Sequence, residues 1–172
     1  DLFPYNVFPT LTQGAGYFFH GFTGGENLLS RNAEGILIPR LMKEWDVAAD
    51  GVTWTFKLEE GVQFHKGYGE MTAEDVIWSM QGFETSKHPR AGQIAKFWAD
   101  REGSFAPDPY TVVVNTGEPV VELIAVGWHQ TPGGASTFIA SKKQTEELGV
   151  EAASEDIAAT GPWEILDHRT GE

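Results

Sequence analysis

The 172-residue chain contains no cysteine. A disulfide framework, a thiolate zinc site and a cysteine nucleophile are therefore excluded. Basic residues are also scarce, because 12 Lys and Arg stand against 25 Asp and Glu and leave a formal net charge of −13. Nucleic-acid and anionic-membrane partners need a basic footprint, so this acidic balance argues against both. No apolar run approaches the length of a transmembrane helix.

Local signatures of catalysis and metal binding are missing as well. The five histidines show no HxH, HxxxH or HExxH spacing, which a local zinc site would require. The adjacent pairs Glu59–Glu60, Glu74–Asp75 and Glu146–Glu147 are expected to be solvated, because neighbours along a helix do not face one another. There is no GxSxG motif, and the glycine pairs lack the lysine of a phosphate-binding loop. The sequence predicts no catalytic residue, metal or cofactor.

Aromatic side chains, in contrast, are abundant, with six Trp, eleven Phe and four Tyr. Aromatic surface is costly to leave in water, so this load predicts either a large core or a surface built for stacking. Trp98 and Trp128 end short helical segments beside loops, where an aromatic residue is either a lid on the core or a platform for a ligand. His20 and His129 lie in aromatic segments bounded by glycines, and for them a structural role and a ligand-binding role both stay open.

The clearest local structure lies between Ile38 and Val76. Asp50–Gly51, set between apolar segments, is typical of a hairpin turn. Residues 52–58 then alternate apolar and polar side chains, which predicts a strand with one packed face. Thr72 is a good N-cap and is followed by acidic residues in the first turn, which favours a helix from this point.

Further elements follow in irregular alternation. Strands are predicted over residues 110–115, 137–140 and 163–166, and a helix capped by Ser141 is predicted over residues 142–148. Gly103–Phe105 is expected to be a loop. Together these patterns predict an α/β fold, with a mixed sheet and flanking helices.

The order of these pieces resembles the extracellular solute-binding proteins of ABC importers, in the group that takes peptides, nickel complexes and related solutes. The matching stretches are Pro39–Val47, Asp50–Leu58, Gly61–Gly67, Thr72–Val76, Asp108–Val112, Ala159–Trp163 and Phe19–Phe22. Members of this family are two-lobed and much longer. The resemblance therefore implies that residues 1–172 are a single lobe fragment, the partial first lobe of a type II periplasmic-binding-protein-like fold. The second lobe of the same chain would be missing.

What the resemblance implies for function is capture of a solute, without catalysis, and its delivery to the permease subunits of an ABC importer. The location would be periplasmic or extracellular, with membrane association through the transporter or a lipid anchor. Peptides are the expected solute, because they are held largely through backbone hydrogen bonds and roomy pockets. The ligand-binding candidates carried over to this sequence are Phe19, His20, Gly21, Phe97, Trp98, Trp128, His129 and Thr137.

Two other classes of function remain open. A carbohydrate-active hydrolase or a carbohydrate-binding module would use the aromatic residues as platforms, and the hydrolase would add two carboxyl groups about 5–9.5 Å apart. An interaction domain would instead dimerise through an unfinished face. Under the solute-binding hypothesis we expect four aromatic residues to form the core and not the binding site. These are Trp45, Trp54, Phe56 and Phe64.

Overall fold

The computed structural model describes residues 24–85, 100–120, 123, 139–164 and 166. In chain order the elements are β1 (Leu29–Arg31), β2 (Leu37–Pro39), β3 (Met42–Val47), β4 (Thr53–Leu58), β5 (Gln63–Phe64), the 3₁₀ turn η2 (His65–Gly67), β6 (Gly69–Glu70), α2 (Ala73–Thr85), β7 (Asp100–Asp108), β8 (Thr111–Asn115), α4 (Lys142–Leu148) and α5 (Val150–Glu155). A four-stranded antiparallel sheet has the order β3-β4-β8-β7, and β1-β2 and β5-β6 form separate two-stranded ribbons. Within this described part, no helix has the length and apolar character needed to cross a membrane.

The turn between β3 and β4 is built around an aspartate. The Oδ1 of Asp50 accepts hydrogen bonds from the backbone N–H groups of Val52 and Thr53, at 2.7 and 2.9 Å. Gly51 has a φ of 70°, a backbone conformation that glycine adopts without strain. The backbone hydrogen bonds from Thr53 and Val52 lower the pKa of Asp50, because they favour the ionised carboxylate. The hairpin predicted from the Asp-Gly pair is confirmed.

Strand register decides which side chains of the sheet are buried. Phe56 of β4 lies between Trp45 of β3 and Val112 of β8, and Trp54 lies opposite Val47. Phe56 is fully buried and Trp54 is 7% exposed, but Trp45 and Val47 are 37% and 41% exposed. The core prediction is therefore confirmed for Trp54 and Phe56 and wrong for Trp45. The reason is that β3 lies at the edge of the described sheet, where the apolar face is incompletely covered.

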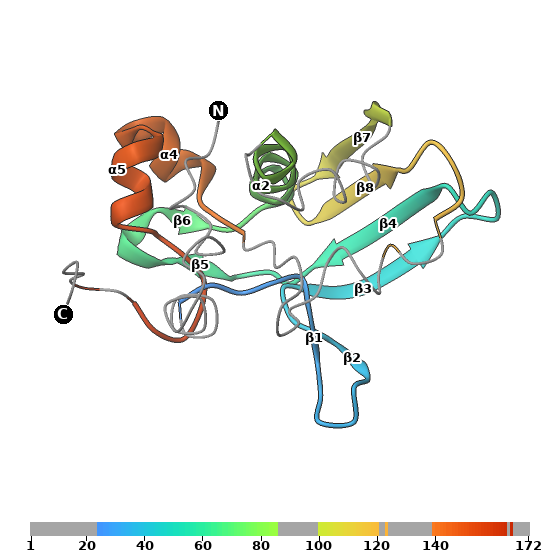
Figure 1. Cartoon of the computed structure of the whole chain (residues 1–172), viewed down its shortest axis with the longest axis horizontal. Coiled ribbons are helices and arrows are strands. Elements are labelled where there is room, and N and C mark those ends of the chain that lie inside the picture. The colour runs from blue at the N-terminus through green and yellow to red at the C-terminus, as the bar shows by residue number, and fades with distance from the viewer. Residues whose placement is uncertain (1–23, 86–99, 121–122, 124–138, 165, 167–172) are drawn as a thin grey trace.

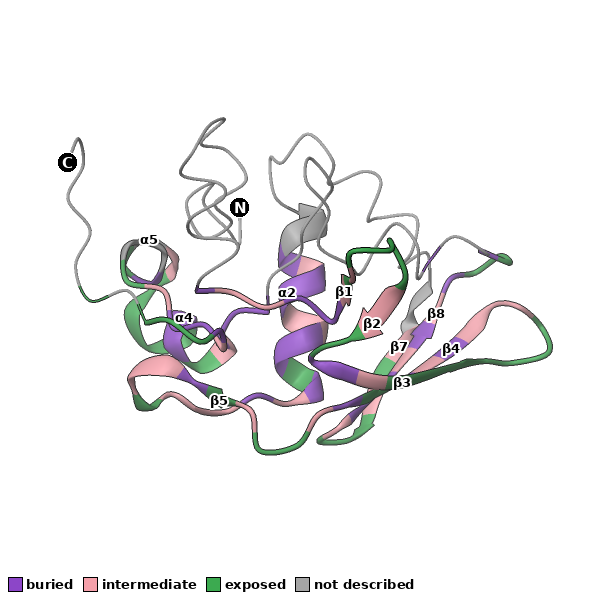
Figure 2. Ribbon diagram, turned by 90° about the horizontal axis from the view of Figure 1, so that it is seen from below, coloured by how far each residue is buried: buried purple, intermediate pink, exposed green. Residues whose placement is uncertain are grey.

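Helix α2 packs against β7 and β8 of this sheet (Figures 1 and 2). Val76 and Met80 of α2 are fully buried in the same cluster as Phe56 and Val112. Phe64 belongs to this cluster too and is 4% exposed, as predicted. Helices α4 and α5 pack against each other at the end of the fold that also carries β5 and β6 (Figure 1). The helix predicted from Thr72 and the mixed α/β architecture are confirmed.

Three local predictions are wrong. Gly103–Phe105, expected as a loop, belongs to β7, whose pairing with β8 shifts register twice and so breaks the alternating pattern that marks a strand. Residues 163, 164 and 166 form no strand, and Trp163 and Leu166 are 67% and 86% exposed. Ile139 and Ala140 also lie outside any strand, and their backbone groups bond to other partners instead.

Candidate functional site

All eight predicted ligand residues lie outside the described part of the chain. They are Phe19, His20, Gly21, Phe97, Trp98, Trp128, His129 and Thr137. The structure does describe the chain that follows each group. Gly24 follows the first group, Asp100 follows the second, and Ile139 follows the third. The site is therefore characterised through the framework that holds these flanking residues.

Two of the three flanking segments are brought together. The backbone N–H of Ile139 donates to the carbonyl oxygen of Glu26 at 3.3 Å, and the N–H of Gly161 donates to the carbonyl oxygen of Gly24 at 3.0 Å. The segment before β1 is therefore bonded to two stretches that are distant in sequence. It follows that residues 24–26 are held next to both Ile139 and Gly161.

A buried serine of α2 holds the segment that follows Ile139. Ser79 is fully buried. Its Oγ accepts a hydrogen bond from the backbone N–H of Ala140 at 3.0 Å and donates one to the carbonyl oxygen of Ala140 at 3.3 Å. A single hydroxyl thus pairs with both backbone groups of a residue that belongs to no helix or strand. Buried backbone groups need such partners, so Ser79 substitutes here for a neighbouring strand.

A carboxylate lies one turn earlier on the same helix. The Oδ2 of Asp75 accepts from the backbone N–H and the Oγ1 of Thr72, at 2.9 and 3.0 Å, and its Oδ1 accepts from the backbone N–H of Lys142 at 3.0 Å. Asp75 therefore caps the N-terminal turn of α2 and the first residue of α4 together. It is 8% exposed. This burial raises the pKa of Asp75, and the hydrogen bonds from Thr72 and Lys142 offset only part of the effect.

Helix α4 is anchored in turn to the chain that follows α5. The Oγ of Ser141 accepts from the N–H of Gln144 at 3.1 Å, which confirms the predicted cap. The side chain of Gln144 accepts from the N–H of Ala158 at 2.8 Å and donates to the carbonyl oxygen of Asp156 at 2.6 Å. The segment from Asp156 to Ala158 is thus fixed on α4.

The chain from residue 156 to residue 161 is also bonded to η2. The backbone N–H of His65 donates to the carbonyl oxygen of Ala159 at 2.9 Å, and its ring Nε2 lies 2.7 Å from the carbonyl oxygen of Gly161. Lys66, which has a φ of 60°, forms an ion pair with Asp156. His65 therefore acts as a structural tether between η2 and the chain at residues 159–161.

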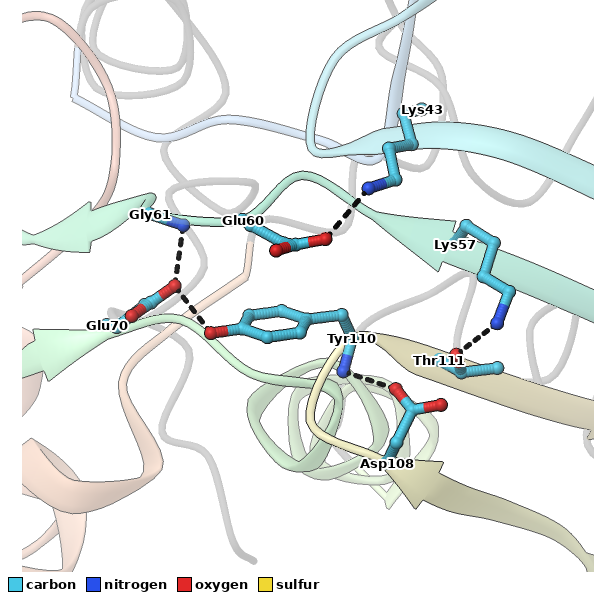
Figure 3. Close-up of polar contacts among 8 residues, drawn as sticks. All are labelled: Lys43, Lys57, Glu60, Gly61, Glu70, Asp108, Tyr110 and Thr111. Carbon is cyan, nitrogen blue, oxygen red and sulfur yellow. Dashed lines mark hydrogen bonds and ion pairs between the residues drawn. The ribbon is translucent and has the colours of Figure 1, made fainter.

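A second polar cluster, shown in Figure 3, joins β6 to the chain before β8. The Oε1 of Glu70 accepts from the N–H of Gly61 at 2.5 Å and from the hydroxyl of Tyr110 at 2.9 Å. The hydrogen bond to Glu70 raises the pKa of Tyr110, since it stabilises the protonated hydroxyl. Lys43 and Glu60 form an ion pair of 3.1 Å nearby. These bonds of Glu70 join β6 to Gly61 and to Tyr110, the residue before β8.

The prediction that the acidic pairs are solvated is wrong for Asp75, because its carboxylate accepts hydrogen bonds from Thr72 and Lys142 in a buried position. Glu74 forms an ion pair with Lys142 at 3.2 Å, while its neighbour Asp75 is buried as a cap. Across the described residues, no three side chains of the metal-ligating types gather to hold an ion. Sequence reasoning did not single out the role of Asp75 and Ser79. Their spacing of four on one helix, and the Thr-x-x-Asp spacing of a capping box, were the available signals.

Comparison with known proteins identifies the family. The sequence model of bacterial extracellular solute-binding proteins, family 5 Middle, matches residues 37–172. Di/tripeptide-binding protein 2 of Pseudomonas aeruginosa is 41% identical over 70 residues, which cover 37% of this chain and 13% of that protein. The glutathione-binding protein GsiB of Shigella boydii is 27% identical over 162 residues, which cover 94% of this chain and 29% of that protein.

A solved structure gives the same fold. The periplasmic binding protein DppA from Helicobacter pylori, in complex with the peptide STSA, matches 96% of this chain and 35% of its own chain, with a TM-score of 0.71 at 20% identity. The predicted fold class is confirmed over this part of a type II periplasmic-binding-protein fold. The chain spans less than a third of the length of the curated relatives compared above. With its family model matched over residues 37–172, the chain belongs to family 5 of the bacterial extracellular solute-binding proteins.

Proposed function

We propose that this chain is part of the substrate-binding component of an ABC importer, which captures peptides or a related small solute and delivers them to permease subunits. The family match over residues 37–172 carries this proposal. Relatives named for the binding of dipeptides, di- or tripeptides and glutathione support peptides as the solute class. The protein then acts in the periplasm or outside the cell, held at the membrane by the transporter or a lipid anchor. It binds without catalysing a reaction.

The proposal includes a division of the protein into lobes. Residues 1–172 are one lobe fragment, and a second lobe of the same chain completes the ligand cleft. The bonds of Gly24 and Glu26 to residues 161 and 139 support a cleft on this side, because they join the described chain that follows two of the predicted ligand segments. The predicted contacts themselves are Phe19, His20, Gly21, Phe97, Trp98, Trp128, His129 and Thr137.

Calorimetry on the intact protein tests this function. Dipeptides, tripeptides and glutathione are titrated in one series, and neutral oligosaccharides and aryl glycosides in a second series that also scores hydrolysis. We expect saturable binding in the peptide series and neither binding nor turnover in the second. Glycoside turnover, or oligosaccharide binding without peptide binding, would refute the proposal in favour of the carbohydrate alternative.

A pair of aromatic variants sharpens the test. Phe97→Ala removes a predicted ligand contact, and Phe105→Ala removes a side chain of β7 that is 51% exposed on the described surface. Peptide affinity is expected to fall in the first variant and to stay unchanged in the second. The 172-residue chain alone is expected to bind more weakly than micromolar, because ligand surface is then buried from one side only.

A further inference from the structure

We propose that the outer edge of β3, over Glu44–Val47, is a docking site for an extended segment of another protein in which apolar and basic side chains alternate. The segment adds to the described sheet as a further strand beside β3. In this mode of recognition, backbone hydrogen bonds supply affinity and the alternating side chains supply specificity. The docking does not depend on which solute the protein carries.

Strand β3 has a backbone edge that faces away from the sheet. It is the first strand in the order β3-β4-β8-β7, and among the described strands β4 is the one that pairs with it. The N–H of Ala48 donates to the carbonyl oxygen of Thr53 at 2.9 Å and so points toward β4. Successive residues of an antiparallel strand direct their backbone groups alternately to the two sides. The N–H and carbonyl groups of Trp45 and Val47 therefore point outward.

The open part of this edge has two defined ends. Before it, the backbone N–H of Met42 donates to the carbonyl oxygen of Leu28 at 3.0 Å, so the edge is occupied there. The register between β3 and β4 then shifts between Met42 and Glu44. After it, the N–H of Gly51 donates to the carbonyl oxygen of Ala48 at 2.9 Å and closes the hairpin turn. The open edge between these ends has the length of a short added strand.

One face of the open edge is apolar. Trp45 and Val47 lie opposite Phe56 and Trp54 in the ladder and so share their face of the sheet. Phe56 and Trp54 belong to the core, whereas Trp45 and Val47 are 37% and 41% exposed. An added strand places side chains of its own beside Trp45 and Val47. Apolar residues at every second position of the docking segment would complete the cover of this face.

The other face of the open edge is acidic. Glu44 and Asp46 are exposed, and no ion pair joins either carboxylate to another described residue. Lys57 lies opposite Glu44 in β4, but its Nζ donates to the Oγ1 of Thr111 at 2.7 Å. Opposite charges on directly facing residues stabilise a pair of strands. The remaining positions of the docking segment are therefore basic.

The same charges discriminate against a second copy of this chain. Two β3 edges can pair antiparallel with matched faces over three residues when either Asp46 or Trp45 lies on the twofold axis. In the first register Asp46 faces its own copy, and in the second Glu44 faces Asp46. Like charges that face each other directly destabilise a pair of strands. The edge is thus protected against self-association and remains open to a basic strand.

Residue-resolved hydrogen exchange on the intact protein tests the site directly. The probe is a blocked synthetic peptide of alternating Lys and Val, and a peptide of alternating Glu and Val is its control. Without peptide, the amides of Trp45 and Val47 are expected to exchange rapidly, because they point outward. With the Lys/Val peptide their exchange should slow, and with the Glu/Val peptide it should not change.

Two charge reversals test the chemistry of the partner. Asp46→Lys changes the open edge, and Glu146→Lys makes the same change in net charge at an exposed position of α4. Fluorescence anisotropy measures the affinity of the labelled Lys/Val peptide. We expect Asp46→Lys to weaken binding about tenfold, because facing charges become alike, and Glu146→Lys to change it by less than about twofold.

A proline variant tests the backbone contribution. Val47→Pro removes an outward N–H, and proline is tolerated in an edge strand where its nitrogen faces away from the ladder. Its binding of the Lys/Val peptide should weaken at least as much as that of Asp46→Lys. Should this variant not fold, Asp46→Lys and hydrogen exchange still decide the proposal.

Four results would overturn the proposal. Slow exchange at Trp45 and Val47 without peptide would mean that the intact protein already covers the edge. Peptide binding that leaves these two amides unprotected would place the peptide elsewhere. Equal losses in Asp46→Lys and Glu146→Lys would mean that the attraction is not specific to β3. A dimer that protects the same amides would assign the edge to a second copy.

Discussion

Replacing Asp75 by Asn removes a charge and one acceptor at the junction of α2 and α4. The two carboxylate oxygens receive only donors, the N–H of Lys142 on one side and the N–H and hydroxyl of Thr72 on the other. An amide has a single oxygen, so its NH₂ group must face a donor on one of the two sides. At least one buried N–H then loses its partner. The expected cost at neutral pH is about 1–3 kcal/mol of unfolding free energy.

The cost of this substitution is expected to depend on pH. Burial raises the pKa of Asp75 above its ordinary value of 3.8, and the hydrogen bonds from Thr72 and Lys142 offset only part of this. The folded state therefore binds the proton more tightly than the unfolded state. The resulting stability is fully present below pH 3.8 and is lost as the pH rises through the raised pKa of the folded state. Each unit of pKa difference corresponds to about 1.4 kcal/mol. Asn does not titrate, so the stability gap between the original chain and the variant should widen as the pH falls.

Urea unfolding followed by tryptophan fluorescence measures this gap, from neutral pH to below pH 3.8. Asp50→Asn is the control with the opposite sign. The pKa of Asp50 is lowered by backbone hydrogen bonds from Thr53 and Val52, so its contribution is present above the unfolded pKa and is lost as the pH falls through the folded pKa. The gap for Asp50→Asn should narrow at acid pH. A gap for Asp75→Asn that stays level or narrows would refute the reasoning.

Three further perturbations have defined outcomes. Phe56→Ala should lower the unfolding free energy by about 3–5 kcal/mol in urea titrations, because it empties a fully buried position; a loss below about 1 kcal/mol would contradict the assigned core. Gly51→Ala should cost about 1–2 kcal/mol by the same assay, since φ is +70° and the new Cβ would lie 3.4 Å from Cβ of Pro119; an unchanged midpoint would argue against this turn. The hydroxyl of Tyr110 should titrate above its ordinary pKa of 10.0 in ultraviolet absorbance, and Glu70→Gln should bring that pKa down; equal curves would contradict the hydrogen bond.

Features that depend on a few consecutive residues were predictable. The turn at Asp50–Gly51 follows from side-chain hydrogen bonds to residues two and three positions ahead. The cap at Ser141 reaches Gln144 within one helical turn. The alternation over β4 was visible because neighbours in the strand point to opposite faces. In each case the interacting groups are close in sequence, so their pattern could be recognised without the fold.

Features that depend on the neighbours of a strand were not predictable. Trp45 pairs with the buried Phe56 of the next strand but is itself 37% exposed, because its strand lies at the edge of the described sheet. The nine-residue strand β7, which includes Gly103–Phe105, could not be recognised in the sequence, because its irregular pairing with β8 breaks the alternation of apolar and polar residues. Trp163 and Leu166 are apolar and exposed, and neither belongs to a strand. An apolar pattern shows that a residue can be buried, whereas only the packed chain shows what covers it.

The stretch from Ile38 to Val76 carries the centre of the resemblance to the family and two of the four strands of the sheet, because its turn, alternation and cap are local and specific. The contacts between α2 and the segment from Ala140 to Lys142 were decided by the tertiary structure. Ser79 meets Ala140 across 61 positions and Asp75 meets Lys142 across 67. Helical spacing places the two side chains on one face of α2, and this placement could be predicted from the sequence. The backbone groups that bond to Ser79 and Asp75 depend on how the distant part of the chain packs against α2, and no local sequence pattern predicts that packing.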